Sequence, residues 1–152
     1  MERVSLVFFI ILFYIFISGI DFIVHGVLYS YGLTFSYEWA MPYWILLAIV
    51  IFVFAIATGI AYWSGSDKSG IDKIEAICII SSISLLNIGG LLDILVYIFW
   101  QRMIPPNNLV WWWSPWYYVF GFWDFGLQLL FFTTICIIIL LIWVPVIYHY
   151  RR

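Results

Sequence analysis

Four long apolar segments constrain this chain more than any other feature of its sequence. They cover residues 4–28, 42–63, 74–100 and 117–148, in a chain whose mean hydropathy is +1.11 and of which only 9% is charged. About 20 helical residues cross a hydrocarbon core of ~30 Å, so each segment is long enough to span a bilayer. Backbone groups find no water in lipid, and each span must therefore be helical. The sequence predicts an all-α, polytopic membrane protein with one integral membrane domain over residues 1–152.

The basic residues predict the orientation of this domain. Arg102 follows the third segment, whereas the other basic residues flank the opposite ends of the segments: Arg3, Lys68, Lys73, Arg151 and Arg152. Lys and Arg gather on the cytoplasmic side of membrane proteins. We therefore expect a four-helix bundle in the cell membrane, with both termini in the cytoplasm.

The two predicted outer loops are rich in aromatic residues, including a run of tryptophans at Trp111–Trp113. Aromatic rings of this kind form belts at the membrane–water interface, where an apolar ring and a polar tip are both accommodated. We interpret the tryptophans as interfacial anchors, with a platform on which a ligand stacks as the alternative.

Four ionisable residues are predicted within the spans: Asp21, His25, Asp93 and Asp124. Such residues are costly in lipid and are functional candidates by default. At 1.5 Å of rise per residue, the three aspartates fall at comparable depths in the outer leaflet. Each also has a polar residue four positions later, on the same helix face. These companions are His25, Tyr97 and Gln128.

We therefore predict a polar pocket between the first, third and fourth spans, which opens outwards with Glu38 and Arg102 near its mouth. Three interpretations stay open. The pocket is a hydrogen-bonded network that orders the helices, a metal site built on Asp21, His25 and a third ligand, or a pathway for protons, quinones or small molecules.

The segments around Asp21 and Asp93 also indicate an internal repeat. The residues 19–25, GIDFIVH, align position by position with the residues 91–97, LLDILVY, so that Asp21 corresponds to Asp93. Asp21 precedes Pro42 at nearly the same interval as Asp93 precedes Pro115. Parallel repeats of this kind occur in transporters. The pattern predicts two tandem helical hairpins, joined by a short cytoplasmic loop.

One motif resembles a known family. Asp21-x3-His25-x12-Glu38 is similar to the Asp-x3-His-x12-His signature of the C subunit of copper membrane monooxygenases, which oxidise ammonia or methane. Glu38 stands where the family has His. The family's second set, Asn-x3-His-x13-His, matches the spacing of Asp93-x3-Tyr97-x13-Trp111 but none of its ligand types. The resemblance implies a divergent relative in which Asp21, His25 and Glu38 hold copper or another transition metal.

The preferred functional hypothesis is a small membrane subunit of a multi-subunit complex, with a redox, respiratory or monooxygenase-like role that rests on the resemblance. Such a subunit is an accessory to an oxidoreductase and not its catalytic part. Its expected partners are the lipid bilayer and other membrane subunits, and no basic patch indicates nucleic acid. The alternative is a small homo-oligomeric transporter or channel that is coupled to protons or cations. A stand-alone membrane enzyme ranks third, because nothing resembles a nucleophile with its base.

Overall fold

The structure, a computed structural model, describes the backbone of residues 3–32 and 37–150 and the side chains of residues 5–32 and 41–150. It is all-helical. Three helices are each long and apolar enough to cross a membrane: α1 (Arg3–Ser30), α2 (Tyr37–Ser64) and α6 (Phe125–Tyr150). A fourth span is possible if α3 (Gly70–Ile88) counts together with α4 (Leu91–Leu95) and η1 (Val96–Trp100). This is the build of a multi-pass membrane protein.

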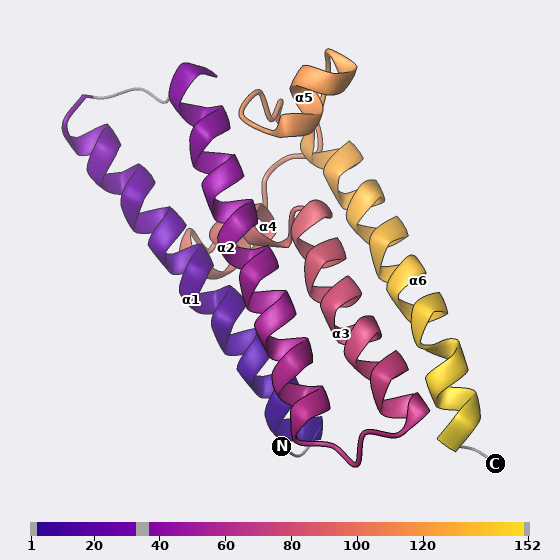
Figure 1. Ribbon diagram of the computed structural model, residues 1–152. Helices are drawn as coiled ribbons and strands as arrows, with labels where there is room; N and C mark the ends of the chain where they lie inside the picture. The colour runs from indigo at the N-terminus through magenta and orange to yellow at the C-terminus, as the bar shows by residue number, and fades with distance from the viewer. Residues whose placement is uncertain (1–2, 33–36, 151–152) are drawn as a thin grey trace.

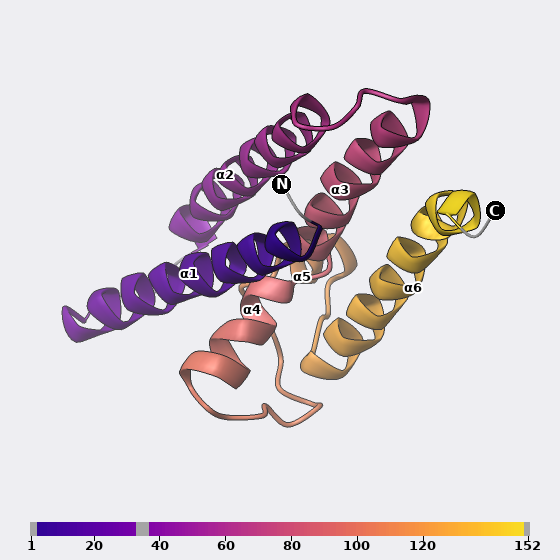
Figure 2. The same ribbon diagram turned by 90° about the horizontal axis from the view of Figure 1, so that it is seen from below.

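The long helices lie side by side, and the chain reverses direction between them (Figure 1). α3 lies between α2 and α6 and packs against both. The first turn of α1, the last turn of α6 and the turn between α2 and α3 lie at one end of the molecule, and α5 (Pro115–Phe120) lies at the other. Seen from below, α1 lies between α2 and the segment that contains α4 (Figure 2).

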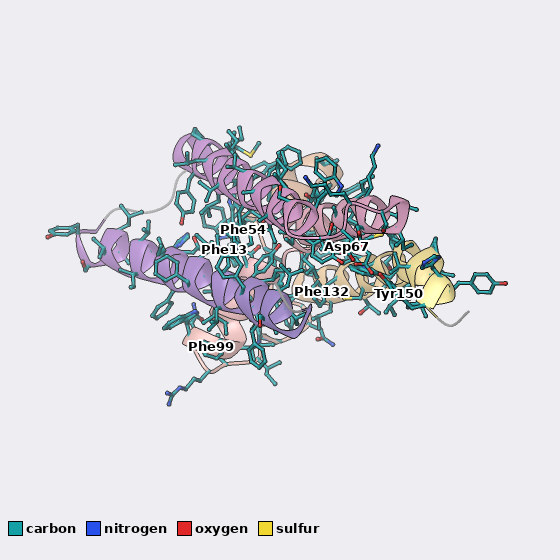
Figure 3. All side chains as sticks on the ribbon, turned by 60° about the horizontal axis from the view of Figure 1, so that its bottom comes forward. Phe13, Phe54, Asp67, Phe99, Phe132 and Tyr150 are labelled. Carbon is teal, nitrogen blue, oxygen red and sulfur yellow. The ribbon has the colours of Figure 1, made fainter. Side chains whose placement is uncertain are left out.

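Aromatic stacking joins α1 to α2. The rings of Phe13 and Phe54 stack with their centroids 3.4 Å apart and their planes at 3°, and the two side chains meet between the helices in Figure 3. The core around them is apolar, with Ile17, Ile51 and Ile83 from three different helices. The Tyr14 hydroxyl group crosses this core and donates to the carbonyl oxygen of Ile83 at 2.6 Å.

The third apolar segment differs from the continuous span 74–100 that hydropathy predicts. The helix breaks at Gly89–Gly90, and α4 and η1 leave the axis of α3 at 65°. Gly90 adopts a φ of +75°, which is a left-handed conformation that favours glycine. A Cβ atom at this position would also overlap the side chain of Gln128. The break turns Asp93 away from the line of α3.

The fourth apolar segment also differs from the prediction of 117–148. Residues 115–120 form the separate short helix α5, and α6 begins only at Phe125. Gly121 ends α5 with a φ of +74°. Around this turn a second apolar core forms, in which Trp111 is completely buried beside Ile94, Trp123 and Phe125. Trp111 is therefore a core residue and not an interfacial anchor.

Candidate functional site

A hollow of about 230 Å³ lies between α1, the start of α2, the α4–η1 segment and the turn that carries Trp112 and Trp113. Both Asp21 and Asp93 line it. The other lining residues are Phe22, His25, Gly26, Tyr29, Trp44, Val96, Tyr97, Gln101, Trp112 and Trp113. The exposed side chains of Tyr29, Gln101 and Trp112 lie at its rim. The hollow is thus a polar site with mainly aromatic walls.

Asp21 is buried, with 3% of its surface exposed, and its carboxylate is well satisfied. The Tyr43 hydroxyl group donates to Asp21 Oδ1 at 2.5 Å. His25 Nδ1 lies 2.8 Å from the backbone oxygen of Asp21 and 3.3 Å from Oδ1. A carbonyl oxygen can only accept a hydrogen bond, so Nδ1 of His25 carries the proton. Asp21, His25 and Tyr43 form a connected polar group that joins α1 to α2.

Asp93 lies in the first turn of α4, directly after the helix break. Its carboxylate interacts electrostatically with Asp21 and His25 across the hollow. Apart from its own backbone N–H, no residue in the described part of the chain hydrogen-bonds this carboxylate. The two aspartates therefore share one site but differ in how well they are satisfied.

Contacts between η1 and α1 hold Asp93 opposite Asp21. Trp100 Nε1 donates to the hydroxyl oxygen of Ser18 at 3.0 Å, and the Trp100 ring stacks on Phe22 at 6.2 Å. Gly19 makes room for this ring, because a Cβ atom there would lie 2.6 Å from Trp100. The small residues on α1 thus allow the broken helix to approach it closely.

A second hollow of about 180 Å³ adjoins the first. Trp44 and Asp93 line both of them, and Ser114, Trp116 and Gln128 line only the second. The buried indole N–H of Trp44 has no acceptor among the described residues. Asp93 therefore borders two hollows in which water or a ligand can be accommodated.

The predicted meeting of three carboxylates holds for Asp21 and Asp93 but not for Asp124. Asp124 precedes α6, and its Oδ1 accepts a hydrogen bond from the backbone N–H of Leu127 at 2.8 Å. This is the geometry of a helix N-cap. α6 contributes no residue to the hollow that contains Asp21 and Asp93. This hollow therefore differs from the predicted pocket between the first, third and fourth spans.

The predicted cluster also includes Tyr97 and Gln128. Only Tyr97 lines the hollow that contains Asp21 and Asp93. Gln128 is buried, and its amide group donates to the carbonyl oxygen of Gly89 and accepts from Trp123 Nε1 at 2.8 Å. It therefore satisfies a carbonyl group at the break after α3. Arg102 is exposed and does not line the hollow. The side chain of Glu38 lies outside the described residues.

Two polar residues of the spans are missing from the predicted cluster: Tyr43 and Glu75. Tyr43 directly follows Pro42 in an aromatic stretch that is typical of an interfacial belt, and only the packing of α2 on α1 brings it to Asp21. Glu75 lies near the start of α3 and is 2% exposed. It lines a third, largely apolar hollow of about 410 Å³ with Tyr62, Ser82 and Trp143. The position of Glu75, an acidic residue inside an apolar segment, was the sequence signal that could have predicted it.

The residues described by the structure include no group of three or more His, Cys, Asp or Glu that could hold a metal ion. Asp21 Oδ1 and His25 Nδ1 are engaged by Tyr43 and by the backbone of Asp21. The set of Asp21, His25 and Glu38 stays a prediction, because it depends on a side chain that is not described.

No family model, curated protein or solved structure matches the chain.

Proposed function

We propose that this protein is a small membrane transporter that moves protons or other cations through the hollow beside Asp93. The observation that carries the proposal is the Asp93 carboxylate, which lies within an apolar segment, borders two adjoining hollows and lacks a partner among the described side chains. Ionisable groups that face a cavity inside a membrane typically mark ion pathways and proton relays. Asp21, His25 and Tyr43 supply a second titratable group within the same hollow.

The proposed arrangement is a four-helix bundle of two tandem hairpins in the cell membrane, with both termini in the cytoplasm. The bent α3–α4–η1 segment then counts as one span. Broken helices whose ends line a binding site near the middle of the membrane are common in transporters. The break at Gly89–Gly90, directly before Asp93, supports this assignment. We further propose that the functional unit is a homo-oligomer.

Flux in proteoliposomes tests the transport function. With the purified protein reconstituted around a pH-sensitive dye, an imposed membrane potential should drive proton entry faster than in protein-free vesicles. Asp93→Asn should reduce the rate to the protein-free level, because the amide keeps the size of the side chain but cannot ionise. Asp124→Asn is the matched control: asparagine caps helices as well as aspartate does, so its flux should be unchanged.

Unchanged flux in Asp93→Asn would refute the proposed pathway. Equal loss in Asp93→Asn and Asp124→Asn would also count against it, because the effect would then not depend on the hollow. Both variants are compared at equal reconstituted amounts, after gel filtration shows the elution volume of the original chain.

A second candidate function is that of a subunit in a larger membrane complex. Only 11% of the most apolar stretch of α6 is buried against the rest of the chain. Most of this helix therefore faces lipid or other helices. The resemblance to monooxygenase C subunits would make the complex a redox one and this chain its accessory part. Copurification from native membranes separates the candidates: a chain that migrates only with copies of itself favours the transporter.

A further inference from the structure

The hollow beside Asp93 combines an acidic group with an aromatic lining. We infer that this hollow, as part of the transport pathway proposed above, accepts a small organic ammonium ion, which the Asp93 carboxylate and the surrounding aromatic rings hold. Cages of aromatic rings are a known means of recognising quaternary and methylated ammonium groups, because the negative face of a ring attracts a cation.

The walls of the hollow fit this chemistry. Six aromatic side chains line it: Phe22, Tyr29, Trp44, Tyr97, Trp112 and Trp113. They come from α1, α2, η1 and the turn before α5, and so surround the space from several sides. Trp112 and Trp113 meet at 87°, with centroids 5.6 Å apart, and thus form two adjacent walls at a right angle. A cation between such walls contacts more than one ring.

The carboxylates of the hollow favour a positive ligand at Asp93. Asp21 already accepts a hydrogen bond from Tyr43 and lies within 3.3 Å of His25, whereas Asp93 has no such partner among the residues that the structure describes. An ionised carboxylate inside a membrane is unfavourable unless it is paired or solvated. An ammonium ion beside Asp93 would neutralise it.

An inorganic ion fits the same space less well. Magnesium and calcium require several oxygen ligands at about 2.0–2.6 Å. The described residues include no group of three or more potential metal ligands of the His, Cys, Asp and Glu types. A single water molecule occupies roughly 10–15 Å³ of a cavity. The volume of this hollow, measured in the same way, is about 230 Å³. Its size and its apolar walls are better matched to a methylated ammonium group.

Binding of choline tests the inference, with its neutral isostere 3,3-dimethyl-1-butanol as the control ligand. The two molecules have the same shape and hydroxyl group and differ by the charged nitrogen. Calorimetry on the detergent-solubilised, full-length chain should detect binding of choline and not of the alcohol. Asp93→Asn should weaken choline binding about 30-fold or more, as expected when one partner of a buried charge pair is removed.

Trp112→Leu tests the aromatic walls and should weaken choline binding about twofold to fivefold. Trp63→Leu is its matched control, because Trp63 is similarly exposed (42% against 39% for Trp112) but does not line the hollow. Its choline affinity should equal that of the original chain. Helix content from circular dichroism and elution volume establish that each variant is folded.

The outcomes separate this inference from the transport function. Proton flux that depends on Asp93, without choline binding, would overturn the ammonium inference and leave the proposed function intact. Choline binding that depends on Asp93 and Trp112, without any flux, would support the ammonium site and refute transport. Equal binding of choline and the neutral alcohol would overturn the inference, because charge would then play no part.

Discussion

Asp21 and Asp93 are the same residue type at similar depth, yet their surroundings give them different properties. Asp21 is held by a hydroxyl donor from α2 and lies beside His25. Asp93 faces two hollows without such support. A well-satisfied carboxylate is suited to holding helices together, and an unsatisfied one is suited to exchanging ligands. We therefore assign Asp21 to positioning and Asp93 to binding.

The bond between Tyr43 and Asp21 leads to a prediction about stability. Tyr43→Phe removes the hydroxyl donor and leaves the ring, so it should destabilise the folded chain by about 0.6–1.7 kcal/mol, the range for hydrogen bonds between membrane helices. A double-mutant cycle with Asp21→Ala, which removes the acceptor, isolates the interaction when it is measured by denaturation in detergent. We expect the two effects to be non-additive. Strict additivity would show that the 2.5 Å contact between these side chains contributes nothing.

Helical spacing predicted part of this chemistry. His25 lies one turn after Asp21 and Tyr97 one turn after Asp93, and all four line one hollow. The same spacing relates Asp124 to Gln128, but these residues support the end of one helix and the start of another. Spacing within a helix shows which side chains share a face. It does not show which other helix that face meets, and for this reason Tyr43 escaped prediction.

At the scale of elements, the break between α3 and α4 determines where Asp93 lies. Hydropathy cannot detect it, because both sides of the break are apolar and the average over a window remains high. The pair Gly89–Gly90 is the local signal, since glycine pairs mark turns. Yet small residues also permit close helix packing in membranes. The structure shows both effects: Gly90 has a positive φ, and a Cβ atom added at Gly89 would lie only 3.3 Å from the side chain of Ile135.

The docking of η1 on α1 yields a second stability prediction. Gly19→Ala would place a methyl group 2.6 Å from the Trp100 ring, which must then shift. We expect a loss of about 1–3 kcal/mol, the usual cost of overpacking. Gly26→Ala is the matched control on the same helix, because nothing lies within 4 Å of its Cβ position. It should be neutral or stabilising by up to about 1 kcal/mol, since alanine favours helix.

Denaturation in detergent measures the stability of both glycine variants. Equal stability of Gly19→Ala and the original chain would contradict the close contact between η1 and α1. Such a result would also remove the support that holds Asp93 opposite Asp21.

At the scale of the whole molecule, the apolar surface is extensive on several helices. The large exposed hydrophobic side chains include Phe8, Leu12 and Phe16 on α1 and Leu130, Leu140 and Leu141 on α6. Acyl chains and partner helices are equally apolar, so hydropathy does not separate the faces that meet them. The presence of several long apolar helices was therefore predictable from the sequence, and α1, α2 and α6 confirm it, whereas the break within the third segment was not.

The orientation in the membrane can be tested because the charged ends are separated. The turn between α2 and α3 lies at the same end of the molecule as the first turn of α1 and the last turn of α6 (Figure 1). Lys68 lies in this turn, whereas Arg102 follows η1 on a different loop. The positive-inside rule then places the turn in the cytoplasm.

Labelling of single cysteines measures this orientation. In a background with Cys78→Ala and Cys136→Ala, an impermeant thiol reagent applied to intact cells should label Asn108→Cys but not Asp67→Cys. After the membrane is permeabilised, both should react, because both positions are exposed. Loss of the Asp67 charge should not itself reverse the protein, since acidic residues contribute little to orientation compared with Lys and Arg. Labelling of Asp67→Cys in intact cells would contradict the cytoplasmic assignment, and labelling of both positions there would indicate that the chain inserts in two directions. In the expected orientation, the rim residue Tyr29 lies on the outer side, because it is in the last turn of α1, at the end of that helix remote from the α2–α3 turn. A ligand would then enter from outside and meet Asp93 before it meets the apolar core.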